Sequence, residues 1–295
     1  MTTMEWANAH YQGGQIRHPL DDVAYVIFRS HLGKDFVLSG RGAGAGGHLA
    51  TGVQGFGQLA TSVLTQGTAQ GVERFTGYVV KRREIHTKIS ISANTPAGFY
   101  VRNEDWWNHQ SITSQGYLMV STLLSGLRIA RVRLGEDVGE GIQGKDASFT
   151  RARDYSDFYW MSEDPFVLGA QERAKWQNKT LQGVGRLVLN NPGEFTAYPE
   201  ILATGPGSWK IQGDDGSMVT FPNIVQNDAI RVQTDRLRPA VTNARGINLW
   251  GQMGGQRLRL SVPPRSTKTI RVEVTAAVST SAILSVIRPK YGRLW

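Results

Sequence analysis

The stretch Glu84-Ile85-His86-Thr87-Lys88-Ile89-Ser90-Ile91-Ser92 decides the fold class. Ile85, Thr87, Ile89 and Ile91 occupy every second position, which is the period of a β-strand with one buried face. The polar residues between them predict an outer face in contact with water. Asn94-Thr95-Pro96 follows and predicts the end of the strand, because proline and asparagine favour turns. We therefore expect a mainly β protein.

Strands of the same kind are expected on both sides of this run. Two apolar runs flank a Gly33-Lys34 turn and predict a hairpin. Alternation further along places Arg131 and Arg133 on the outer face of a strand. The strands expected in this half cover 24–28, 35–38, 84–92, 118–122, 127–134 and 155–161. Only two short helices are predicted, over 102–110, with Asn103 as its cap, and over 167–177.

Beyond residue 182 the pattern changes to short strands at close spacing. Turns such as Asn191-Pro192-Gly193 and Asp214-Asp215-Gly216 separate them. The predicted strands cover 185–189, 198–204, 208–212, 218–221, 229–234, 247–250, 256–262, 269–274 and 282–287. About nine strands in ~110 residues are typical of an antiparallel sandwich. We expect two domains, a β-rich domain over 1–182 and a β-sandwich over 183–295.

Residues 39–77 interrupt the first domain with eleven glycines and few apolar residues. A loop of this length is uncommon inside a compact domain unless it has a function or becomes ordered against a neighbour. We therefore expect this glycine-rich loop to take part in assembly.

Composition excludes several classes of protein. The chain has 295 residues and no cysteine, so disulfide scaffolds, cysteine-bound metals and thiol nucleophiles are absent. No apolar run is long enough to cross a membrane, and the first residues lack the pattern of a signal peptide, which predicts a soluble protein.

Positive charge is concentrated in the second half. The net charge is +9, and residues 181–295 hold 14 basic against 7 acidic side chains. Arg257, Arg259 and Arg271 alternate with apolar residues, which predicts a solvated sheet face or a protein contact. No aromatic RNA-binding motif or recognition helix accompanies them, so specific nucleic-acid binding is not expected.

Motifs for catalysis and cofactors are weak. Residues 42–47 satisfy G-x-G-x-x-G, but neither a helix-forming segment nor the required acid follows, so no dinucleotide cofactor is expected. The six histidines show no metal-ligand spacing, and no serine-hydrolase motif occurs. Glu104-Asp105-Trp106-Trp107 could form a glycosidase or sugar-stacking site, but a capped helix docked by its tryptophans explains it better. No catalytic, cofactor or metal residue is predicted.

Several segments together resemble a known family of phage tail proteins. They are Phe36-Val37-Leu38-Ser39-Gly40, Asp105-Trp106-Trp107, the strand at 127–134, Asp164-Pro165-Phe166, Val188-Leu189-Asn190-Asn191-Pro192-Gly193 and Ala197-Tyr198-Pro199-Glu200-Ile201. In these motifs the chain is similar to the distal tail protein, a minor tail protein of siphophages that infect actinobacteria. The glycine-rich loop is not covered by the resemblance.

The resemblance implies a structural virion protein without enzyme activity, cofactor or metal. It implies a homohexameric ring that joins the tail tube to the tail-tip hub, with the first domains forming the ring and a galectin-like sandwich outside it. Tail tube, tape measure and hub or baseplate proteins would be the partners. The protein would be made in the host bacterial cytoplasm and reside at the tail tip of the virion.

A carbohydrate-binding module is the alternative hypothesis. Galectin-like sandwiches hold sugars on an aromatic platform with polar neighbours, and Trp250 between Asn248 and Gln252 is the best candidate for contact with cell-wall glycan. Burial of Trp250 in the core is the competing interpretation.

Overall fold

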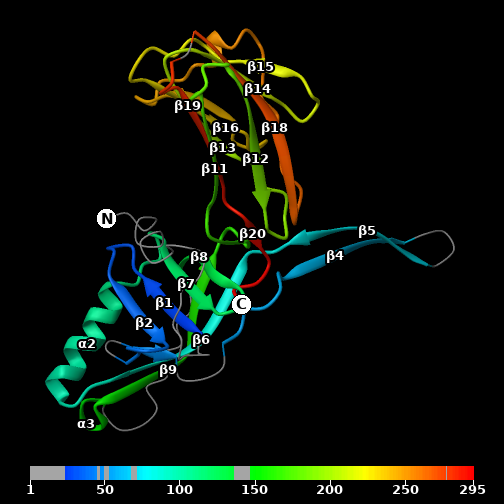
Figure 1. Cartoon of the computed structure of the whole chain (residues 1–295). Helices are drawn as coiled ribbons and strands as arrows, with labels where there is room; N and C mark the ends of the chain where they lie inside the picture. The colour runs from blue at the N-terminus through cyan, green and yellow to red at the C-terminus, as the bar shows by residue number, and fades with distance from the viewer. Residues whose placement is uncertain (1–23, 45–46, 50–52, 68–71, 136–146, 277) are drawn as a thin grey trace. The chain divides into compact units, whose positions relative to one another are not determined.

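The computed structural model describes residues 24–44, 47–49, 53–67, 72–135, 147–276 and 278–295. Parts of the glycine motif at 42–47 lie outside these residues. The chain forms two compact units (Figure 1): the first unit holds Met1–Gly169 and Tyr291–Trp295, and the sandwich unit holds Ala170–Lys290. Both are built mainly from antiparallel strands, as the alternating pattern predicts.

The first unit is built on one large sheet. Its main strands have the order β2-β1-β7-β8-β9-β6-β3, and β10 and β20 pair beside this path. The bounds are β1 (Tyr25–Arg29), β2 (Asp35–Ser39), β3 (His48–Leu49), β6 (Arg83–Ser92), β7 (Gly116–Thr122), β8 (Gly126–Leu134), β9 (Ala152–Ser162), β10 (Val167–Leu168) and β20 (Lys290–Tyr291). The predicted hairpin is confirmed, with Phe28 opposite Phe36. In β6, Ile85, Ile89 and Ile91 are fully buried, as their period requires.

Helix α2 (Pro96–Asn108) begins earlier than predicted. Thr95 caps it, because its hydroxyl oxygen accepts a hydrogen bond from the Gly98 N–H at 3.1 Å. Pro96 is the first helical residue, a position whose N–H has no partner within the helix, so proline is tolerated there. The predicted cap Asn103 lies inside the helix and accepts a hydrogen bond from the Tyr155 hydroxyl. A shorter helix, α3 (Ala147–Thr150), precedes β9.

An aromatic cluster fills the core of the first unit. The Trp106 indole is fully buried between the helix and the sheet. Its ring centroid lies 5.1 Å from that of Phe36, 5.4 Å from Phe158 and 6.3 Å from Trp160. These rings meet edge-on, the arrangement that aromatic quadrupoles favour.

The predicted helix over 167–177 is wrong, because this segment contains two strands. Val167–Leu168 form β10, and Glu172–Gln177 form β11, which pairs with β19 in the sandwich unit. The division between the units consequently follows Gly169 rather than residue 182. The final segment, Tyr291–Trp295, belongs to the first unit and not to the sandwich as expected.

The sandwich unit contains two antiparallel sheets. One has the order β11-β19-β13-β16-β17 and the other β12-β18-β14-β15. The new bounds are β12 (Val184–Asn191), β13 (Glu200–Thr204), β14 (Ser208–Gln212), β15 (Met218–Thr220), β16 (Ala229–Gln233), β17 (Ala240–Asn243), β18 (Ser266–Thr275) and β19 (Ala282–Ile287). Trp209, Ile211, Val262 and Ile283 lie in the shared core and are fully buried.

Two predicted strands of the sandwich are not strands. Residues 247–250 make one bridge, between Thr242 and Asn248, and then enter a short 3₁₀ helix, η1 (Trp250–Gln252). Residues 256–262 keep their alternation, with Leu258 and Leu260 buried, but make only the bridge from Val262 to Ala197. Alternate burial in this segment therefore arises without a hydrogen-bonded ladder.

The Asn191-Pro192-Gly193 turn has a clear structural role. The fully buried Asn191 side chain donates from Nδ2 to the carbonyls of Phe195, Val262 and Pro263 at 2.9–3.0 Å. Its Oδ1 accepts from the Gly193 N–H at 3.0 Å. One amide thus joins the end of β12 to two other segments of the sandwich.

Candidate assembly surfaces

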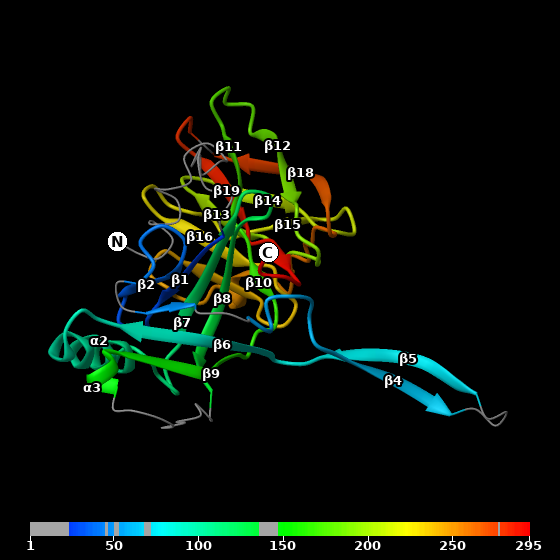
Figure 2. The ribbon, with the colours of Figure 1, turned by 90° about the horizontal axis from the view of Figure 1, so that it is seen from below.

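A projecting hairpin in the first unit has mostly exposed side chains. Strands β4 (Thr61–Gly67) and β5 (Glu73–Val80) pair with each other and, among the described residues, with no other strand. Figures 1 and 2 show it extending away from the large sheet of its unit. The prediction of one long glycine-rich loop over 39–77 is therefore wrong, because β3, β4 and the first part of β5 lie within it.

Large apolar side chains cover one face of the β4–β5 hairpin. Val63 lies opposite Tyr78, and Thr65 lies opposite Phe75. Opposed residues share a face, so Val63, Phe75 and Tyr78 lie together. Their exposures are 63%, 60% and 60%.

The other face of the hairpin is also partly apolar, with Leu64 47% and Val79 51% exposed. A two-stranded hairpin is marginally stable in water unless it packs against something else. Contiguous exposed apolar side chains typically mark a protein interface. The hairpin therefore has the composition of a surface that a partner covers.

Arg83 anchors the base of the hairpin. The Arg83 side chain is buried. Its Nη1 donates to the Gly55 carbonyl, and its Nε donates to the Pro165 carbonyl at 3.0 Å. Its Nη2 donates to the Gly292 carbonyl at 2.6 Å. A longer bond of 3.2 Å reaches the Gly57 carbonyl. Burial lowers the pKa of Arg83 from its usual value, because removal from water disfavours the charged form.

Charged side chains lie on and beside β2, the end strand of the large sheet, which approaches β3 at the other end. Strand β2 pairs only with β1 among the residues that the structure describes. Both oxygens of Asp35 accept hydrogen bonds from Arg29 at 2.6 Å, and Lys34 donates to Asp105 at 2.6 Å. Charges at an edge strand discourage unspecific strand pairing.

The acid and tryptophan cluster of α2 packs within the first unit. Trp106 lies in the core, and the Trp107 Nε1–H donates to the Tyr155 hydroxyl at 2.9 Å. Asp105 is engaged by Lys34, whereas Glu104 is exposed. Core packing of the tryptophans is confirmed, because the Trp106 indole is fully buried among aromatic rings and the Trp107 indole is held by its hydrogen bond to Tyr155.

The candidate glycan residues lie together around η1. Trp250 is half-buried and packs against the sandwich core, while Asn248 and Gln252 are exposed. The Asn248 Oδ1 accepts a hydrogen bond from the Trp250 N–H at 2.8 Å. The burial of Trp250 falls between the two interpretations, and glycan contact at this place stays a prediction.

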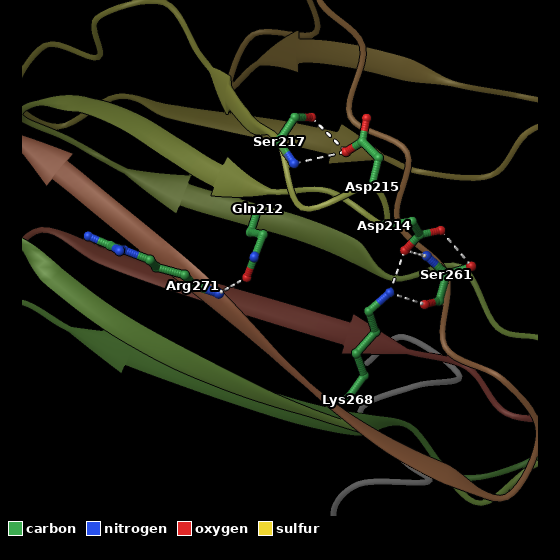
Figure 3. A network of polar contacts seen from close by, with 7 residues as sticks. All are labelled: Gln212, Asp214, Asp215, Ser217, Ser261, Lys268 and Arg271. Atoms are coloured by element: carbon green, nitrogen blue, oxygen red, sulfur yellow. Dashed lines mark hydrogen bonds and ion pairs between the residues drawn. The ribbon is translucent and has the colours of Figure 1, made fainter.

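The Asp214-Asp215-Gly216 turn joins β14 to β15, as predicted, and supports the segment at 256–262 (Figure 3). Asp214 accepts hydrogen bonds from the Ser261 N–H at 3.0 Å, the Ser261 hydroxyl at 2.7 Å and the Lys268 Nζ at 2.6 Å. Burial alone would raise the pKa of Asp214, but these hydrogen bonds outweigh it and hold the pKa below its usual value.

The predicted outer positions of the basic residues are mostly confirmed. Arg131, Arg257, Arg259 and Arg271 are exposed. Arg271 pairs with Glu273 at 2.7 Å. Arg133 is half-buried and pairs with Glu163 at 2.6 Å. Within each unit, these side chains are exposed to solvent or form local ion pairs.

The described residues contain neither a metal-ligating cluster nor a membrane-spanning helix. In this part of the chain no group of three or more histidines, aspartates or glutamates is placed to hold a metal ion. No helix among the described residues has the length and apolarity needed to span a bilayer.

Comparison with known proteins gives matches at the level of structure only. No model of a known protein family matches the sequence, and no curated protein matches it. The Dit protein of phage SPP1, described as a paradigm of the hub adsorption apparatus in phages that infect Gram-positive hosts, matches with a TM-score of 0.62 at 14% identity. The match covers 91% of this chain and 99% of that one.

The phage P2 baseplate is similar as well. A chain of its activated conformation with Ca matches with a TM-score of 0.52 at 12% identity, over 90% of this chain and 98% of that one. The corresponding structure with Sr matches with a TM-score of 0.51. The chain thus has the fold of phage hub and baseplate proteins, which is the fold that its resemblance to the distal tail protein predicts.

Proposed function

We propose that this protein is a structural component of a phage tail tip and acts without catalysis. Copies of the chain form a closed ring, a homohexamer, that joins the tail tube to the tail-tip hub. Tail tube, tape measure and hub or baseplate proteins are its partners, and the assembled virion is its location. The fold shared with the SPP1 Dit protein and the P2 baseplate supports this proposal.

The β4–β5 hairpin is the observation that carries the proposal. Its apolar face, formed by Val63, Phe75 and Tyr78, is unfavourable in water and finds no cover among the described residues of its own chain. A second copy of the chain can cover it. In this proposal the hairpin docks on a different surface of the next copy, which makes the contact heterologous. Heterologous contacts close into a ring when the rotation between neighbouring copies completes a full turn, and the proposed homohexamer is such a closed ring.

The oligomeric state of the purified full chain tests the proposal. We expect mass photometry and native mass spectrometry to show a hexamer that becomes more populated as concentration rises. The double variant Phe75→Asp/Tyr78→Asp places two charges in the interface and should remain monomeric while keeping its circular dichroism spectrum.

Val225→Asp is the matched control, because Val225 is 62% exposed in the sandwich unit and should leave assembly unchanged. A wild-type chain that stays monomeric at every concentration would contradict the proposal. Assembly of the double variant at the wild-type concentration would show that the hairpin is not the interface.

A further inference from the structure

The segment Tyr291–Trp295, which we call the closing segment, follows the sandwich and packs into the first unit. The Leu294 side chain is fully buried in the core of that unit. Leu294 N–H donates to the Phe56 carbonyl at 2.9 Å, and the Trp295 ring meets the Phe56 ring edge-on at 4.8 Å. The sandwich is therefore an insertion between two parts of one folding unit.

The place that the closing segment occupies is shaped for it. The Arg128 guanidinium lies 3.4 Å from the centroid of the Tyr291 ring, a cation–π contact. A Cβ atom at Gly169 would lie 2.6 Å from the same ring, so glycine permits the close approach. Arg83 donates to the Gly292 carbonyl at 2.6 Å. The site thus combines a buried apolar position, a hydrogen-bond donor for the backbone and a cation for an aromatic ring.

Contacts of Arg83 and Leu294 also hold the two ends of the β4–β5 hairpin, residues 54–57 and 81–83, which we call the hairpin base. Residues 55–57 lead into β4, and Arg83 follows β5. Arg83 binds the carbonyls of Gly55 and Gly57, while Leu294 binds the carbonyl of Phe56 between them. Figure 1 places the end of the chain beside the segment that enters β4. The closing segment and the hairpin base therefore share one set of bonds.

We propose that the first unit contains a peptide-binding site, formed around Phe56 and Arg83, whose ligand is the chain's own closing segment and whose occupancy makes the hairpin competent for assembly. The assembly part of this inference rests on the proposed function. Residues 291–295 are synthesised after the sandwich. A chain whose sandwich is still being synthesised cannot fill the site, so the hairpin of such a chain does not yet join a ring.

Hydrogen exchange on the full-length chain tests the site. Leu294→Asp places a charge where the side chain is fully buried, and Leu294→Met is the matched control because it conserves volume and polarity. For Leu294→Asp we expect amides at 54–57 and 81–83 to exchange at least about tenfold faster, with unchanged exchange in the sandwich unit. The synthetic peptide Tyr-Gly-Arg-Leu-Trp at millimolar concentration should restore part of the protection.

Trp295→Ala is a milder second variant that is not expected to unfold the first unit, because Trp295 is 46% exposed and its removal leaves Leu294 buried in place. It should loosen the same base amides less than Leu294→Asp does. Unchanged exchange at the base in both variants would refute the site. Equal loss of protection across the whole first unit in both variants would also refute it, since the segment would then be general core.

Native mass spectrometry of the same samples tests the link to assembly. Loss of hexamer in Leu294→Asp, with wild-type assembly in Leu294→Met, supports it. Normal rings from Leu294→Asp would overturn the link even if the base is loosened. A monomeric wild type would instead refute the proposed function, while the exchange comparison would still decide whether the site exists.

Discussion

Replacing Arg83 with methionine should destabilise the first unit strongly. Four carbonyl groups, those of Gly55, Gly57, Pro165 and Gly292, would lose a charged donor. A hydrogen bond to a charged group contributes about 1.5–3 kcal/mol, and a buried acceptor left without a partner costs a similar amount.

The gain from removing a buried charge opposes this loss. Burial already disfavours the charged guanidinium, as its lowered pKa shows, and apolar replacements of buried ion pairs are sometimes neutral or stabilising. Arg83, however, forms no ion pair in the described part of the chain, and its partners are backbone carbonyls that no methionine can satisfy. We therefore expect a net loss of about 3–5 kcal/mol in the free energy of unfolding.

Chemical denaturation followed by tryptophan fluorescence measures this loss. Because the chain has two units, two transitions are expected, and only that of the first unit should move. Arg83→Lys should recover little, since one ammonium group cannot reach carbonyls arranged around a planar guanidinium. Arg82→Met is the control: its exposed pair with Glu84 at 2.9 Å should contribute at most about 1 kcal/mol. Stability of Arg83→Met within 1 kcal/mol of wild type, on the order of the control, would refute the reasoning.

Three further predictions concern the sandwich unit. Asn191→Ala removes the donor to three carbonyls and should lower the free energy of unfolding of this unit by about 2–4 kcal/mol, which thermal unfolding measures against Asn190→Ala at the exposed neighbouring position. The folded pKa of Asp214 lies below its unfolded value of about 3.9, so its contribution to the free energy of unfolding is present above that pH and is lost as pH falls through the folded pKa. In a curve of stability against pH, Asp214→Asn should reduce the loss of stability at acid pH. An unchanged acid limb would contradict this role of Asp214. If Trp250 contacts glycan, saturable binding to cell-wall polysaccharide should disappear in Trp250→Ala, whereas absence of binding by the wild type would remove the carbohydrate-binding alternative.

Local pattern explains why much of the fold could be predicted from the chain. The strands β6, β14 and β19 follow from alternation alone, because one buried face imposes a period of two on neighbouring residues. The β1–β2 hairpin was also predictable from local sequence. The turn needs a φ of 86° at Gly33, which suits glycine, and the two flanking runs are close in sequence. The burial of Trp106 was likewise predicted from the sequence, because a short helix carrying two tryptophans is expected to dock them on a neighbouring sheet.

Elements that depend on distant residues were missed or misassigned. Residues 167–177 contain apolar and polar residues at helical spacing, yet β11 forms because β19, far away in the sequence, supplies its partner. In the hairpin at 61–80, the alternation of Val63 and Thr65 and the aromatic residues Phe75 and Tyr78 were present as signals. Eleven glycines across 39–77 obscured them.

The sequence by itself determined the class of the protein, its two β-rich halves and the absence of cysteine chemistry. Only the tertiary structure decided that the hairpin stands apart, that Arg83 binds carbonyls from separate segments, and that Leu294 completes the core of the first unit. The reason is physical: a periodic pattern reports which face of an element is buried, whereas the identity of the covering segment depends on contacts across the whole chain.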